Sequence, residues 1–216
     1  MDLSVKKVKS MEQEEMVKKL EQFASRNRIP FYSCFNKQRK LPNLARRYIA
    51  ARYVIYDLNQ IQEGLYFLFY DSSTGGAHGR SGWGDTFCGL YSEIEGFNAN
   101  VIIKERLWLD GLSFKKRHFS GKHDIDKRLS ILSDSKLSKH DFLSVKKLRH
   151  FMDMKTSMPA LRVETEVEAW NIIPELDQKT LLSIRVSHWL IDSSKIKWFI
   201  ENACKYLLDE SFKFPK

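Results

Sequence analysis

Four strand-like runs follow one another in the first half of the sequence, with no helical pattern between them. They cover residues 47–58, 64–72, 86–94 and 100–109, and they are rich in the Tyr, Phe, Val and Ile that strands favour. Turn residues at 59–64 and 95–100 fit hairpin connections. Because strands and helices do not alternate, the sequence predicts an α+β fold with a largely antiparallel sheet, not a doubly wound α/β fold.

Three helices are predicted around this sheet, one near the N-terminus, one in the middle and one at the C-terminus. The first begins at Ser10, where Gln13 completes a capping-box pattern, and Pro30 ends it. Ser138 caps the second helix, and the polar cluster at 192–194 caps the third. Each helix carries an apolar stripe, so each is expected to pack one face on the domain.

Two stretches between these elements are predicted to be irregular. Residues 36–46 are interpreted as a loop with a short helical turn, and residues 110–124 as a polar, basic loop. The second loop leaves the domain organisation open. A single domain over 1–216 is our main expectation, and a sub-domain boundary near 110–125 is the alternative.

The second half of the sequence adds strands at 128–132, 161–169 and 179–190. In the middle one, apolar residues alternate with charged residues, which predicts a half-buried strand with one face in water. The glutamates expected on that solvated face are Glu164, Glu166 and Glu168.

Cysteine usage and hydropathy predict a cytoplasmic protein. The three cysteines, Cys34, Cys88 and Cys204, are far apart and form no CxxC pair, which argues against a disulfide framework and a structural zinc site. We expect them to act as small packing residues. No apolar run is long enough for a transmembrane helix, and the first residues do not look like a secretory signal.

The net charge of +9 is unevenly distributed along the sequence. No carboxylate occurs between Glu21 and Asp57, and aromatic residues interleave there with eight cations. These cations are Arg26, Arg28, Lys37, Arg39, Lys40, Arg46, Arg47 and Arg52. The pattern predicts an anionic partner, because cations attract phosphates and aromatic rings stack on bases or lie at lipid surfaces. The alternative is a strand with one core face and one wet face.

A glycine-rich loop, SSTGGAHGRSGWGDTFCG, covers residues 72–89. It lacks the Gly-Lys-Ser/Thr of a P-loop and the third glycine and helix of a dinucleotide loop, so no nucleotide cofactor is expected. A long hairpin loop is the simplest interpretation. Arg80 and Trp83 could still hold an anion or stack on a ring.

Catalytic and metal-binding signatures are incomplete. The stretch HFSGKHDID at 118–126 has histidines and aspartates, but its spacing fits no standard metal site and the flanking cations would repel a metal ion. We therefore predict a solvated loop and no metal. No GxSxG, HExxH or kinase motif occurs.

The order of elements after residue 118 resembles that of an uncharacterised group of bacterial domains of unknown function. HDID is followed by a short strand with SILSD, a helix with FLSVKKLRHFM, two strands and a closing helix. The resemblance covers about residues 118–210 and is one of pattern, since Leu129 and Ile131 stand where the group tends to have phenylalanine and valine. It implies no activity and no site residue.

These observations favour a cytoplasmic, non-enzymatic binding module with a basic face for an anionic partner, which could be a protein surface, a nucleic acid or a lipid headgroup. One alternative is a hydrolase or transferase that uses His78, Arg80 and Asp85 of the glycine-rich loop. Another is a subunit of a larger assembly, docked through a terminal helix.

Overall fold

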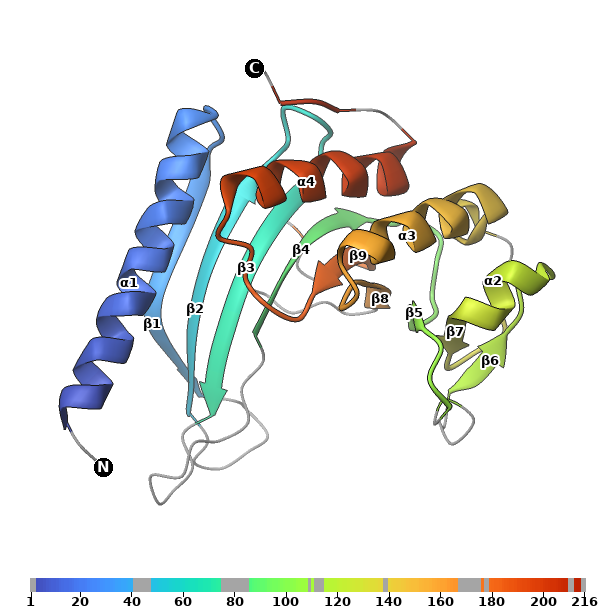
Figure 1. Cartoon of the computed structure of the whole chain (residues 1–216), viewed down its shortest axis with the longest axis horizontal. Helices are drawn as coiled ribbons and strands as arrows, with labels where there is room; N and C mark the ends of the chain where they lie inside the picture. The colour runs from blue at the N-terminus through green and yellow to red at the C-terminus, as the bar shows by residue number, and fades with distance from the viewer. Residues whose placement is uncertain are drawn as a thin grey trace.

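The computed structural model describes residues 3–40, 48–74, 86–108, 110, 115–137, 140–166, 176, 179–209 and 212–214 (Figure 1). The side chains of residues 3–13, 35–40, 48–51, 72–74 and 166 lie outside that description. Within the described residues the chain forms a nine-stranded sheet and four α-helices, which confirms the predicted α+β class. Each pair of neighbouring strands in this sheet is antiparallel.

The strands in chain order are β1 (Phe31–Lys40), β2 (Tyr48–Asp57), β3 (Leu65–Thr74), β4 (Thr86–Glu93), β5 (Val101–Glu105), β6 (Lys116–His118), β7 (Leu129–Ser133), β8 (Arg162–Glu166) and β9 (Leu181–Val186). The helices are α1 (Leu3–Arg26), α2 (His123–Arg128), α3 (Val145–Ser157) and α4 (Ser193–Leu208). A short 3₁₀ helix, η2 (Asp141–Leu143), precedes α3.

The strand order across the sheet is β1-β2-β3-β4-β9-β8-β5-β7-β6. The first four strands form a meander in sequence order. The last strand, β9, then pairs with β4 on one side and β8 on the other, so it joins the second half of the chain to the first. The two edges of the sheet are therefore β1 and β6, and the strands on either side of residues 110–125 belong to the same sheet.

One face of the sheet carries the main hydrophobic core, to which all four helices contribute. In Figure 1, α1 runs along β1 and β2, α4 crosses the central strands, and α2 lies beside β6 and β7. Phe67 of β3 meets Phe199 of α4 with ring centres 5.4 Å apart. Tyr206 is fully buried, and its hydroxyl donates to the Phe142 carbonyl at 2.8 Å, so the phenol leaves no buried polar group unsatisfied.

The opposite face carries a smaller aromatic cluster on β2, β3, β4 and β9. At its centre Gly89 lets β4 approach β9 closely. A Cβ at Gly89 would lie 2.5 Å from the Cβ of Arg185 and 2.7 Å from the Ile184 carbonyl oxygen. The Arg185 guanidinium lies over the ring of Phe87, 4.9 Å from its centre.

The structure confirms the predicted strands at 47–58, 64–72, 86–94 and 128–132, which correspond to β2, β3, β4 and β7. The predicted N-cap of the C-terminal helix is also confirmed, since the Asp192 side chain accepts from the Lys195 backbone N–H at 3.0 Å. Burial of Cys88 and Cys204 agrees with their expected packing role.

The prediction of a loop at 36–46 is wrong for its first half, because residues 31–40 form β1. Residues 36–40 are all polar, and the register shifts between Cys34 and Lys37, so no alternating pattern marks this edge strand. The prediction of an irregular stretch at 110–124 is also wrong in part, because β6 and the start of α2 lie within it.

Two predicted helix starts are corrected. The first helix, α1, begins at Leu3, so Ser10 lies inside it; no Gly or Pro interrupts the preceding residues. The second, α3, is capped by Ser144, whose side chain accepts from the Lys147 N–H, and Ser138 lies outside the described residues. Among the helices that the structure describes, none combines the length and the apolar character needed to cross a bilayer.

Candidate functional site

Three of the predicted anion-binding arginines have described side chains. Arg26 and Arg28 are exposed where α1 ends and the chain turns toward β1. Arg52 is partly buried on β2 and forms an ion pair with Asp71, its direct neighbour on β3. Because Asp71 already neutralises it, Arg52 has less charge to offer to an anionic partner than the two exposed arginines.

The other predicted anion-binding residues have no described side chains. Lys37, Arg39 and Lys40 lie on β1, but their side chains are outside the described set. The remaining predicted site residues, Arg46, Arg47, Arg80 and Trp83, lie outside the described residues altogether. Since β1 is an edge strand, its cations also have an ordinary structural purpose, which is to discourage edge-to-edge pairing with another sheet.

The glycine-rich loop connects β3 to β4, and its residues 75–85 lie outside the described part of the chain, His78 and Asp85 included. The antiparallel pairing of β3 with β4 confirms that the loop joins two adjacent strands. At its base, Thr86 donates to the Asp71 carboxylate at 2.9 Å. The enzymatic hypothesis built on this loop stays a prediction.

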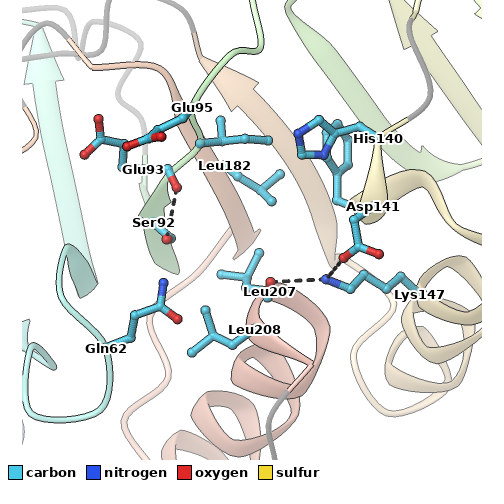
Figure 2. A pocket seen from close by; sticks show the side chains of 12 residues that line it. Gln62, Ser92, Glu93, Glu95, His140, Asp141, Lys147, Leu182, Leu207 and Leu208 are labelled. Carbon is cyan, nitrogen blue, oxygen red and sulfur yellow. Dashed lines mark hydrogen bonds and ion pairs between the residues drawn. The ribbon is translucent and has the colours of Figure 1, made fainter.

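A pocket of about 340 Å³ lies where the end of β4, the η2–α3 segment and the end of α4 meet. Figure 2 shows Ser92 and Glu93 across the pocket from Leu207 and Leu208, with Asp141 and Lys147 on another side. Its lining residues are Gln62, Ser92, Glu93, Ile94, Glu95, His140, Asp141, Phe142, Lys147, Leu182, Leu207 and Leu208.

Lys147 is the buried cation of this pocket, with only 5% of its side chain exposed. Its ammonium lies 2.5 Å from the Asp141 carboxylate and 3.4 Å from that of Asp209, and it donates to the Leu207 carbonyl at 3.2 Å. A hydrogen bond from Lys146 to Asp209 holds the pKa of that carboxyl below its ordinary value. Lys147 therefore ties α3 to the end of α4 and is already neutralised.

The electrostatic character of the pocket does not suit an anion. Glu93, Glu95 and Asp141 contribute carboxylates to its wall, and Glu93 is paired with Lys179 at 2.6 Å. His140 packs its ring on Phe142, with centres 5.1 Å apart. Because the one lysine of the lining is already paired with Asp141, the lining offers no unpaired lysine or arginine to an anion.

A larger groove of about 680 Å³ lies between the end of α3 and the start of α4. Met158, Leu190 and Trp198 give it a mainly apolar wall, with His188 and Lys195 also on its lining. The described residues contain no group of three or more His, Cys, Asp or Glu side chains placed to hold a metal ion.

A different kind of site lies at the far edge of the sheet, on the surface formed by Arg106, Leu107, Trp108, Arg117, Phe119 and Arg128. We call it the α2–β6 surface. Among the described residues five large apolar side chains are exposed, and three of them are here: Leu107 at 53%, Trp108 at 88% and Phe119 at 68%. Such a gathering of exposed apolar side chains is uncommon on a folded protein unless the surface binds something.

Hydrogen bonds bring the three arginines of the α2–β6 surface together. Arg106 and Arg117 both donate to the Asp126 carbonyl, at 3.4 Å and 2.6 Å. Arg106 also donates its backbone N–H to the Arg128 carbonyl at 2.9 Å, so these two residues face each other just beyond the β5–β7 pairing. Arg117 lies over the Phe119 ring, 4.8 Å from its centre.

The carboxylates of this region are engaged elsewhere. Residues 104–128 hold eight basic and four acidic residues, a net charge of +4. Glu105 lies 3.8 Å from Lys155, Asp110 2.7 Å from Lys104 and Asp124 3.4 Å from Arg149. The fourth, Asp126, accepts from Ser120. Within the described residues, no carboxylate therefore forms an ion pair with Arg106, Arg117 or Arg128.

The turn that carries Trp108 is fixed by the buried carboxylate of Asp110. This side chain accepts from the Leu107 N–H at 2.8 Å and from the Ser130 hydroxyl at 2.6 Å, and it pairs with Lys104. Burial alone would raise the pKa of Asp110, but the hydrogen bonds from Lys104, Ser130 and Leu107 outweigh it and lower that pKa.

The sequence did not identify the α2–β6 surface. The stretch at 118–126 was predicted to be a solvated loop, whereas residues 123–128 form α2 and bury Ile125. The usable signal was the unusual pair of Leu107 and Trp108 beside a cation-rich stretch. Their exposure, however, depends on long-range contacts that no local pattern encodes.

One expectation about the sheet is corrected here as well. Glu164 was predicted to face water, but only 6% of it is exposed. It lies between two arginines, with Arg162 at 3.1 Å and Arg185 in a second ion pair. Its role is therefore structural.

Comparison with known proteins identified no relative of this chain. No protein-family model matches the chain, and neither the curated proteins nor the solved structures contain a match. The resemblance to a group of bacterial domains stays a prediction.

Proposed function

We propose that the protein is a non-enzymatic binding module that holds an anionic partner on a basic surface, and that the α2–β6 surface is the main contact. The supporting observation is that Arg106 and Arg117 both donate to the Asp126 carbonyl and that Arg128 is joined to Arg106 by a backbone hydrogen bond, while no carboxylate is paired with any of the three among the described residues. Guanidinium groups bind phosphates and carboxylates through paired hydrogen bonds.

The placement of the cations also supports this choice over the upstream segment between Arg26 and Arg52. A backbone hydrogen bond joins Arg106 and Arg128 just beyond the β5–β7 pairing, which brings two like charges close enough to repel each other. An anionic ligand would relieve that repulsion. By contrast, Arg52 is neutralised by Asp71, so it has no comparable need of a partner.

Retention on heparin at increasing salt tests the proposal. We expect the wild-type protein to be retained and the double variant Arg106→Gln/Arg128→Gln to elute at clearly lower salt, because two unpaired cations are lost. The matched control is Arg26→Gln/Arg28→Gln, which removes two exposed cations from the end of α1.

Two results would contradict the proposal. Lack of retention of the wild-type protein at low salt would exclude an electrostatic surface of this kind. Loss of retention only in the Arg26→Gln/Arg28→Gln protein would place the contact upstream, in the segment that the charge pattern first indicated.

A further inference from the structure

The α2–β6 surface combines two chemical properties that are found together on proteins that bind membrane surfaces. We infer, building on the function proposed above, that its anionic partner is a lipid bilayer with acidic headgroups. Leu107, Trp108 and Phe119 would enter the interfacial layer, while Arg106, Arg117 and Arg128 would bind headgroup phosphates or carboxylates.

The apolar half of this contact is built into the fold. Trp108 is 88% exposed, yet its turn is held by the backbone bond from Asp110 N–H to the Leu107 carbonyl at 3.1 Å and by the Asp110 side chain. A buried carboxylate that also binds Lys104 and Ser130 anchors this turn to the sheet. The backbone of the turn that carries the exposed indole is therefore held to the sheet, which suits an interfacial tryptophan.

The cationic half lies directly beside it. Arg106 precedes Leu107 in the chain, and Arg117 covers one side of the Phe119 ring. Each cation that lies near an acidic leaflet strengthens the attachment of a protein to the membrane. Stable attachment requires two signals, and here the inserted apolar side chains are one and the basic patch is the other.

A bilayer fits this surface better than a single-stranded nucleic acid. Bases stack on aromatic rings, but Leu107, which is more than half exposed, has no ring and would gain nothing from a base. Protruding apolar side chains between cations suit a flat, partly apolar surface.

Cosedimentation of the full-length protein with vesicles tests the inference. The vesicles are phosphatidylcholine alone or phosphatidylcholine with phosphatidylserine, and a labelled single-stranded oligonucleotide is titrated in parallel. We expect binding to the phosphatidylserine vesicles only. Trp108→Ser and Arg106→Gln/Arg128→Gln should each weaken it by roughly tenfold or more.

Ile191→Ser is the matched control, because it removes an exposed apolar side chain from a different part of the molecule. It should leave vesicle binding unchanged, and thermal unfolding of each variant confirms that it is folded. Heparin retention without binding to phosphatidylserine vesicles would overturn the inference and leave the proposed function standing. Oligonucleotide binding that depends on Trp108, without vesicle binding, would identify nucleic acid as the partner instead. Failure of both heparin and vesicle binding would refute both proposals.

Discussion

Replacement of Glu164 by glutamine tests how charge is accommodated within the sheet. Glu164 is 6% exposed on β8, where one carboxylate oxygen lies 3.1 Å from Arg162 and the other pairs with Arg185. The two arginines occupy directly opposite positions on β8 and β9. Glutamine preserves the shape and one acceptor but removes the charge, so the two guanidinium groups would lose the carboxylate that balances their like charges.

The magnitude follows from the burial of the site. Opposite unit charges at about 4 Å attract by roughly 4 kcal/mol at an effective dielectric constant of about 20. The remaining amide oxygen still accepts a hydrogen bond, which recovers part of this energy, and breaking a buried pair typically costs about 3–5 kcal/mol. We therefore expect Glu164→Gln to lower the free energy of unfolding by about 3 kcal/mol, or Tm by roughly 6–12 °C for a chain of this length.

Urea denaturation followed by circular dichroism measures this loss. The matched control is Glu15→Gln, which removes the same charge from an exposed pair with Lys19 on α1, where both side chains are more than half exposed. Such helix pairs contribute about 0.3–0.5 kcal/mol, so the control should be close to wild type. A loss below about 1 kcal/mol for Glu164→Gln would refute the view that this buried carboxylate neutralises the two arginines beside it.

Three further predictions concern packing, thiol chemistry and pH. Gly89→Ala should destabilise the fold by about 2–3 kcal/mol in the same urea assay, because its Cβ would clash with the β9 backbone; a neutral result would mean that the strands can separate locally. Burial raises the pKa of the Cys88 and Cys204 thiols to about 12. In a thiol-labelling time course at pH 8, these two thiols should therefore react only as the protein unfolds, and the partly exposed Cys34 should react before them. The pKa of Asp110 is lowered below its ordinary value of about 4. The contribution of its ionised carboxylate to the free energy of unfolding is therefore complete above about pH 4, and it is lost as the pH falls through the pKa of the folded state. The difference in unfolding free energy between wild type and Asp110→Asn should therefore be constant from pH 5 to 7 and shrink below pH 4, and a difference that grows on acidification would contradict this assignment.

Local sequence determined the elements whose signals do not depend on distant partners. Their Tyr, Phe, Val and Ile content and the turn residues beside them were enough to identify β2, β3 and β4, because each of these strands pairs with its neighbours in the chain. The cap at Asp192 was also local, since its acceptor and donor are three residues apart. From consecutive strands the antiparallel α+β class followed directly.

The order of strands and the candidate site were decided by tertiary structure. Nothing local places β9 between β4 and β8, and that placement is what buries Glu164 beside Arg185 of a later strand. The same holds for the α2–β6 surface, where Arg106 and Arg128 meet although 21 residues separate them in the chain. A charge pattern gives the number of cations in a segment, but which of them remain unpaired depends on the carboxylates that folding brings near, and only the folded chain determines those distances.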